Sequence, residues 1–141
     1  DVAVVGLGAG SLNCYAKPGQ RVHFIEIDPD VVTIAKNYFT FLASCPEPEI
    51  SIGDGRLVLA ADNRQYDLLI IDEVGVQSGT EAESRALFDV FNERYQNCKP
   101  TILISNLSPA GFREAVGDRI ADRVKEDGGE VLMFNWGSAR E

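Results

Sequence analysis

Short blocks of apolar residues recur along the chain and are separated by polar segments with helical spacing. The blocks are four to seven residues long and run into glycine, proline or acidic residues, which is typical of parallel strands buried on both faces. They predict strands at Val2–Val5, Arg21–Ile27, Glu49–Ile52, Tyr66–Asp72, Pro100–Ser105 and Glu130–Phe134.

The segments between these blocks predict helices. Asp28 is the expected N-cap of one helix, with Pro29 at its first helical position. A Gly/Ser/Thr segment, Gly75–Thr80, precedes the longest helix, and residues 38–48 are predicted to be irregular. The predicted helices are Ser11–Ala16, Asp28–Asn37, Gly55–Ala61, Glu81–Asn97, Pro109–Gly117 and Arg119–Lys125.

Alternation of strand and helix favours a three-layer, Rossmann-like, doubly wound α/β fold with a mostly parallel sheet of about six strands. At 141 residues the chain is predicted to be a single domain that unfolds cooperatively. Right-handed crossovers favour the strand order 3-2-1-4-5, with the last strand at the edge beyond.

Composition limits the partners. A net charge of −9 argues against a nucleic-acid interface, which needs a basic patch, and no apolar run reaches membrane-spanning length. Cys14, Cys45 and Cys98 have no metal-ligand or disulfide-framework spacing, so we expect reduced, mostly buried thiols in a cytoplasmic protein without a metal. A monomer or weak homo-oligomer is expected.

A glycine loop and two acids form the first candidate site. Gly6, Gly8 and Gly10 follow the first strand and open a helix, where backbone can approach a ligand closely. Glu26 follows Gly6 by 20 residues, at the end of the second strand, where a carboxylate can accept hydrogen bonds from ribose. Asp54 follows the third strand. The pattern predicts a nucleoside pocket; the alternative is a glycine turn beside two solvated acids.

Four motifs in this first half resemble the spermidine-synthase-like branch of the S-adenosylmethionine-dependent methyltransferase fold. They are Val-Val-Gly-Leu-Gly-Ala-Gly-Ser-Leu, Phe-Ile-Glu-Ile-Asp-Pro-Asp, Tyr-Phe-Thr-Phe-Leu and Gly-Asp-Gly-Arg-Leu, within residues 2–72. The resemblance implies S-adenosylmethionine or a related adenine nucleoside as ligand, with Gly6, Gly8 and Gly10 under its amino-acid end. It also implies that Glu26 holds the ribose, Asp54 contacts the adenine and Asp72 lies near an amine substrate.

The second half resembles a different family. Leu68–Asp72 and Glu73 form an apolar strand ending in two acids, the Walker B arrangement for Mg²⁺ and water activation. With Pro-Thr-Ile-Leu-Ile-Ser-Asn-Leu, Gly-Asp-Arg-Ile-Ala-Asp-Arg and Phe-Asn-Trp-Gly-Ser-Ala-Arg, residues 66–141 are similar to the bacterial helicase-loader branch of the AAA+ ATPases.

That resemblance implies further roles. Asn106 would sense the γ-phosphate, Arg119 (or Arg123) would reach a neighbouring subunit's nucleotide, and Arg140 would be a second sensor. The alternative for these arginines is a solvated helix face or tail. No Gly-x-x-x-x-Gly-Lys-Ser/Thr motif occurs in these 141 residues. Mg-ATP is therefore not the expected cofactor, and Asp72 and Glu73, the candidate catalytic residues, would face an empty phosphate site.

Two aromatic side chains are predicted to be structural. His23 alternates with apolar neighbours on a strand and is expected to be packed rather than catalytic. Trp136 is expected to anchor the core.

Together these features predict an engineered or recombined chimera. Its methyltransferase-like half, residues 1–65, and its AAA+-like half, residues 74–141, would share the strand at 66–73. A bare strand start without a methionine suits a trimmed piece. The chimera is expected to bind at most an adenine nucleoside, without efficient catalysis. An ATP-binding or ATPase module, a scaffold that binds nothing and a natural methyltransferase remnant are the alternatives.

Overall fold

The computed structural model describes residues 1–75, 81–126 and 128–136. Residues 76–80 of the predicted Gly75–Thr80 loop, and Arg140, lie outside this part.

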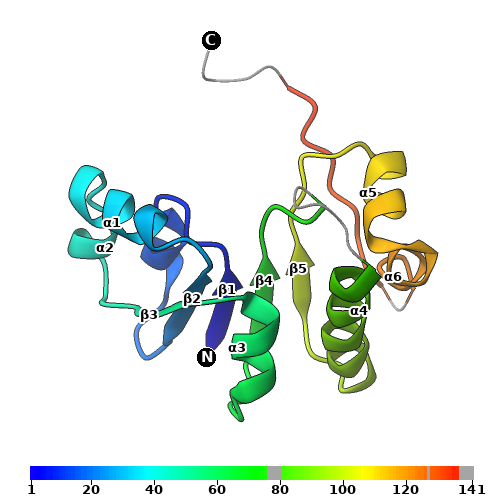
Figure 1. Cartoon of the computed structure of the whole chain (residues 1–141), viewed down its shortest axis with the longest axis horizontal. Helices are drawn as coiled ribbons and strands as arrows, with labels where there is room; N and C mark the ends of the chain where they lie inside the picture. Colours follow the sequence, from blue (N-terminus) through cyan, green and yellow to red (C-terminus); the bar gives the residue numbers. More distant parts are fainter. Residues whose placement is uncertain (76–80, 127, 137–141) are drawn as a thin grey trace.

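A parallel sheet runs through the middle of the molecule (Figure 1). Its strand order is β3-β2-β1-β4-β5, and every neighbouring pair is parallel, which confirms the predicted order 3-2-1-4-5. The strands are β1 (Val2–Val5), β2 (Val22–Glu26), β3 (Glu49–Ile52), β4 (Leu68–Ile71) and β5 (Thr101–Leu103).

Helices lie on both faces of the sheet, so the predicted three-layer α/β class is confirmed. Hydrophobic contacts place η1, α1 and α2 on one face of the sheet and α3 to α6 on the other. The helices are η1 (Ser11–Tyr15), α1 (Pro29–Tyr38), α2 (Phe41–Ser44), α3 (Gly55–Ala61), α4 (Glu81–Gln96), α5 (Pro109–Val116) and α6 (Asp118–Arg123).

Local capping explains where α1 begins. The Asp28 carboxylate accepts a hydrogen bond from the Asp30 N–H at 2.9 Å, and Pro29 is the first residue of α1, as predicted. The short helix predicted at Ser11–Ala16 is present as the 3₁₀ helix η1. One local prediction was wrong: the segment predicted to be irregular contains the single turn α2.

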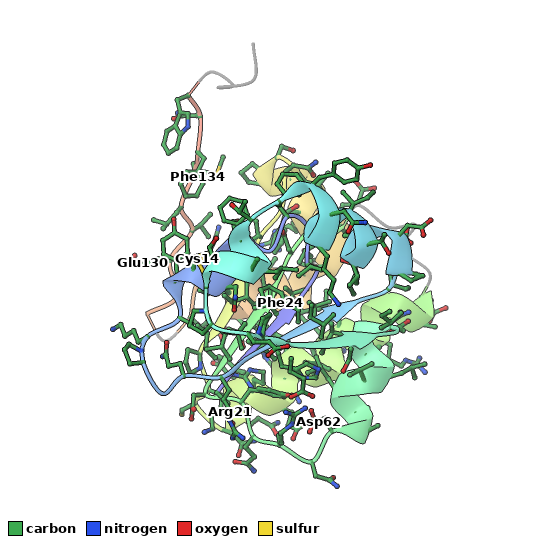
Figure 2. The ribbon with its side chains drawn as sticks, turned by 90° about the vertical axis from the view of Figure 1, so that its left-hand side faces the viewer. Cys14, Arg21, Phe24, Asp62, Glu130 and Phe134 are labelled. Atoms are coloured by element: carbon green, nitrogen blue, oxygen red, sulfur yellow. A yellow bond between two sulfur atoms is a disulfide. The ribbon has the colours of Figure 1, made fainter. Side chains whose placement is uncertain are left out.

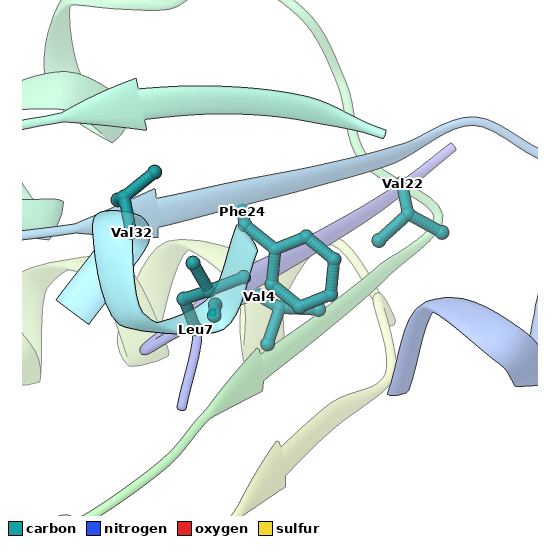
Figure 3. Close-up of a cluster of buried hydrophobic side chains, with 6 residues drawn as sticks. Val4, Leu7, Val22, Phe24 and Val32 are labelled. Carbon is teal, nitrogen blue, oxygen red and sulfur yellow. The ribbon is translucent and has the colours of Figure 1, made fainter. Parts of the chain in front are cut away.

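The larger core lies under η1, α1 and α2. Val4 and Phe24, from adjacent strands, pack against Leu7 of the glycine loop and Val32 of α1 (Figure 3). Phe24 is fully buried, which contributes about 1.5–3 kcal/mol on the usual scale for such a side chain. This cluster holds the glycine loop against the sheet.

The opposite face divides into two clusters. Ala3, Tyr66 and Leu69 pack with α3, and Val74, Phe91 and Ile120 belong to a cluster formed by α4, α5 and α6. On that face, helices α3 to α6 cover β4 and β5. On the other face, Ile102 of β5 and Ile104 just after the strand are 46% and 41% exposed.

The predicted sixth strand is wrong. Residues 130–136 form no strand, and the described sheet has five strands. Trp136 is 72% exposed and contacts Phe134 edge to face, so it is not the expected core anchor. Figure 2 shows this segment leaving the body of the molecule at Phe134. Apolar residues predict that a segment will be covered, but they do not specify by what.

The expectation of reduced, buried thiols is also wrong. Cys14 of η1 and Cys45, after α2, form a disulfide whose Cα atoms are 5.2 Å apart, and Cys98 is exposed. The 31-residue separation carries no disulfide signature, because the tertiary packing of η1 on α2 brings the two thiols together.

Candidate functional site

A cleft of about 410 Å³ opens at the carboxyl ends of the strands. It is lined by six residues that the sequence singled out: Gly6, Gly8, Glu26, Asp54, Asp72 and Glu73. Parallel strands bring their carboxyl ends to one edge of the sheet, which is why residues spread over 68 positions meet there.

The glycine loop forms one wall. Gly6 has φ +98°, and a Cβ placed on it would lie 3.3 Å from the Asp72 Cβ, so a side chain at this position would be strained. Gly10 does not line the cleft. It is buried where a Cβ would lie 2.7 Å from a methyl carbon of Leu42. In this structure Gly10 thus serves packing between η1 and α2.

Glu26 joins the glycine loop to the end of β2. Its side chain is 8% exposed, and its two carboxylate oxygens accept hydrogen bonds from the N–H groups of Leu7 (2.9 Å) and Asp28 (3.0 Å). Each carboxylate oxygen has two lone pairs, so both retain capacity to accept a further hydrogen bond from the cleft. The contact with Leu7 makes the position of this acid and the shape of the loop interdependent.

Asp54 is held by its own helix. It caps α3 through the Arg56 N–H (2.9 Å) and accepts two side-chain hydrogen bonds from the Arg56 guanidinium. The guanidinium lowers the pKa of Asp54 to about 2. The sequence reading missed Arg56 as a lining residue. The spacing could have indicated this contact, because the side chain of an arginine two residues after a capping aspartate can fold back onto the carboxylate.

Asp72 and Glu73 complete the acidic wall. Both are exposed, and the Asp72 carboxylate accepts a hydrogen bond from the Glu73 N–H at 2.8 Å. Glu73 has φ +54°, which is unusual for a residue with a side chain. The charged residues among the described lining of the cleft are thus four acids and Arg56.

The predicted nucleotide sensors do not line this cleft. Asn106 is exposed in the loop after β5. Arg119 is exposed and lies 5.8 Å from the Phe88 ring. Arg123 contacts the Phe88 and Tyr95 rings and donates a hydrogen bond to Asn92. Within one chain Arg119 and Arg123 of α6 therefore pack against aromatic rings of α4.

A second polar cluster lies at the opposite, amino edge of the sheet, where Figure 2 labels Asp62. His23 is buried, as predicted, and its Nδ1 and Nε2 lie 2.6 Å from the Tyr66 hydroxyl and 2.8 Å from Ser51 Oγ. The Tyr66 hydroxyl donates a hydrogen bond to Asp62, and the Arg64 guanidinium also lies 3.3 Å from Nδ1 of His23.

Two carboxylates and an arginine surround the His23 ring. Glu49 and Asp62 lie 3.7 and 3.8 Å from its ring nitrogens, and Arg64 forms ion pairs with both acids. Burial lowers the pKa of His23 despite these acids. Hydrogen bonds from Arg64 lower the pKa values of Glu49 and Asp62. In the described residues no group of three or more His, Cys, Asp or Glu could hold a metal.

Comparison with known proteins decides between the two resemblances for part of the chain. The family model described as IstB-like ATP binding protein matches residues 38–125. The chain belongs to the IstB-like ATP binding protein family. The match covers β4 and the segments on both sides of it, including residues 38–65 of the half that resembles methyltransferases.

Curated relatives of this IstB-like protein agree. It is 33% identical over 76 residues to the uncharacterized protein YdaV of Escherichia coli K12, covering 54% of this chain and 31% of YdaV. It is 31% identical over 83 residues to the replicative helicase loader DnaC of Buchnera aphidicola (subsp. Acyrthosiphon pisum), covering 59% and 34% of the two chains. For DnaC of E. coli K12 the identity is 30% over 82 residues, covering 58% and 34%.

These matches confirm the helicase-loader resemblance of the second half. They support the ATP-binding alternative over the chimeric scaffold, while the methyltransferase half remains a prediction. Each match spans about a third of the relative's length. The helices in the described part of the chain all lack the length or hydrophobicity of a membrane span.

Proposed function

We propose that this chain binds an adenine nucleotide or nucleoside in the cleft at the carboxyl ends of β1, β2 and β4, with the ribose on Glu26. One observation carries the proposal: a buried carboxylate faces the cleft and is tied to the backbone of a glycine loop. Such a group can accept both ribose hydroxyls, and the loop allows a ligand to approach the backbone. The ATP-binding name of the family supports adenine as the base.

The cleft suits the nucleoside part better than a chain of phosphates. No lysine is among its described lining residues, and Arg56 is engaged by Asp54. Four acids would repel a polyphosphate unless a cation neutralised it. Should a nucleotide bind with Mg²⁺, Asp72 and Glu73 are the residues that would hold the cation.

The same acidic lining favours a second candidate, S-adenosylmethionine. This ligand offers the ribose hydroxyls that Glu26 would accept and adds a positively charged sulfonium. Opposite charges attract across the cleft, so a cationic nucleoside should bind more tightly than a phosphorylated one. The residues that support this candidate are Glu26 and Asp72, which both line the cleft.

Calorimetric titration of adenosine, Mg-ATP and S-adenosylmethionine tests both candidates. We expect weak binding that Glu26→Ala reduces by about 1.5–3 kcal/mol, because a charged acceptor making two hydrogen bonds is lost. Glu26 also holds the glycine loop, so circular dichroism must show that each variant is folded, and Glu26→Gln serves as the conservative change. The control is Glu47→Ala, an exposed glutamate that does not line the cleft.

Three outcomes divide the hypotheses. Binding of all three ligands with equal dependence on Glu26 supports a nucleoside site. Preference for Mg-ATP, lost in Asp72→Asn, supports the ATP-binding reading with a cation. No binding at millimolar concentration, or binding indifferent to Glu26→Ala, removes the proposal.

A further inference from the structure

Within the described residues, no strand pairs with the outer edge of β5. Hydrogen bonds from Leu69 N–H to the Pro100 carbonyl and from Ile104 N–H to the Ile71 carbonyl show which backbone groups face β4. By alternation, the backbone groups of Thr101 and Leu103 face outward. The strand Thr101–Leu103 itself contains no charge and no proline; the edge-blunting features are its three-residue length and the Lys99-Pro100 pair before it.

A cavity lies beside this edge on the helix-covered face. It measures about 470 Å³ and is lined by Phe91 and Tyr95 of α4 and Thr101 of β5, among others. Lys99 and Glu130 of the same chain also line it, so in an exchanged dimer the partner's Glu130 would take this place. On the opposite face, Ile102 and Ile104 are exposed. A strand added to β5 would therefore find space for side chains on one face and apolar surface on the other.

The chain itself contains a segment that fits. Val131–Phe134 is a run of four apolar residues, each 53–72% exposed, and Trp136 beyond it is 72% exposed. The run is apolar on both faces, which is the pattern of a strand buried on both sides. It pairs with no strand of its own chain in the described residues, and Figure 2 shows it projecting from the body.

Charge sets a direction and a register. Lys99 precedes β5 and Glu130 precedes the apolar run, so a parallel addition brings these two opposite charges together. In that register Leu132 and Phe134 lie beside Thr101 and Leu103, whose side chains face α4 and the cavity. Met133 then lies beside Ile102 on the exposed face.

We propose that two copies of this chain associate by reciprocal strand exchange, in which Glu130–Phe134 of each copy adds to β5 of the other. The occupant of the edge is the second copy, because one chain carries both a matching acceptor edge and an exposed apolar run, Val131–Phe134, that projects from its own body beyond Glu130. Contacts of this kind are isologous, so the two exchanges form a closed dimer. This inference does not depend on the nucleotide site.

Sedimentation equilibrium from micromolar to millimolar protein tests the proposal. Wild type should form a dimer. Phe134→Glu, which damages the donor, and Ile102→Lys, which damages the acceptor, should each raise the dimer dissociation constant about tenfold or more. Leu57→Glu is the matched control, because Leu57 on α3 is also 72% exposed but lies away from this edge.

Mixing provides the specific test. Chains with Phe134→Glu keep an intact edge and chains with Ile102→Lys keep an intact donor, so an equimolar mixture should recover dimer through one exchange. A monomeric wild type, equal weakening by Leu57→Glu, or no recovery on mixing would overturn the proposal.

A cross-link keeps the proposal testable if a variant fails to fold. In a Cys98→Ser background, chains with Ile102→Cys and chains with Met133→Cys should form an intermolecular disulfide on oxidation. The same pair placed in one chain should yield cross-linked dimers rather than an internal bridge. An internal bridge alone would show that the segment docks on its own chain, against the proposal.

Discussion

Acidic side chains gather both at the amino ends and at the carboxyl ends of the parallel strands, here called the amino edge and the carboxyl edge. The two groups differ in how their charges are paired. At the amino edge, Glu49 and Asp62 are each matched by Arg64, and His23 and Tyr66 complete a network within the protein. At the carboxyl edge, four acids line a cleft whose described lining has Arg56 as its one cation. Charges that are neutralised internally stabilise a fold, whereas charges that face an open cleft remain able to select a ligand.

This comparison implies that amino-edge substitutions should change stability and carboxyl-edge substitutions should change binding. The largest expected effect is at the amino edge. His23→Ala should lower the free energy of unfolding by about 2–4 kcal/mol, because it opens a buried cavity and removes two hydrogen bonds.

Urea denaturation measures the effect of His23→Ala, and titration of the folded variant should give wild-type ligand affinity. A His23→Ala variant with wild-type stability and altered ligand affinity would contradict the expectation that amino-edge substitutions change stability rather than binding.

The same network predicts acid sensitivity. His23 has a lowered pKa, so the unfolded chain binds its proton more readily and stability is lost as pH falls through the histidine range. Glu49 and Asp62 have lowered pKa values too, so their contribution is present above the usual carboxyl pKa and is lost as pH falls further. All three groups act in the same direction.

Unfolding free energies measured from roughly pH 7 to pH 5 should therefore decrease toward acid, and the His23→Ala variant should show a flatter profile. A wild-type profile that rises toward pH 5 would contradict this account.

At the carboxyl edge, Asp72→Asn removes one of the four acids without removing a backbone hydrogen bond, since an amide oxygen also accepts from the Glu73 N–H. We expect a stability change within about 0.5 kcal/mol. Binding of ATP without Mg²⁺ should improve by about 0.5–1 kcal/mol, because repulsion across the cleft decreases. Calorimetry with and without Mg²⁺ measures this, and weaker binding of metal-free ATP would argue that Asp72 contacts the ligand directly.

Glu73→Gln addresses the Walker B resemblance. We expect no ATP hydrolysis by wild type, because Glu73 can position water only against a γ-phosphate held by other groups. Phosphate release that requires Mg²⁺ and disappears in Glu73→Gln would establish an ATPase and make this edge catalytic.

The smallest expected effect belongs to Arg140→Ala. The helicase-loader resemblance implies a sensor role for Arg140, whereas a nucleoside site built on Glu26 needs no such residue. Nucleoside affinity should be unchanged by calorimetry. A measurable loss would show that the AAA+ resemblance carries function here.

Local patterns in the sequence were enough to predict the alternation of strands and helices and the order of the five strands. Right-handed crossovers between parallel strands leave few arrangements, and buried strands such as Val22–Glu26 have a strong signal. The cleft residues Gly6, Gly8, Glu26, Asp54, Asp72 and Glu73 were predictable for the same reason, because strand ends in a parallel sheet share one edge.

Tertiary structure decided what the periodicity does not encode. The Cys14–Cys45 disulfide depends on how η1 meets α2, and Gly10 became a packing residue because Leu42 lies against it. The Arg56 side chain pairs with Asp54 through a local turn. The Arg123 side chain packs on two aromatic rings that are distant in sequence. The apolar run at Val131–Phe134 shows the limit most clearly: hydrophobicity determines that a segment should be covered, but only packing decides which surface covers it.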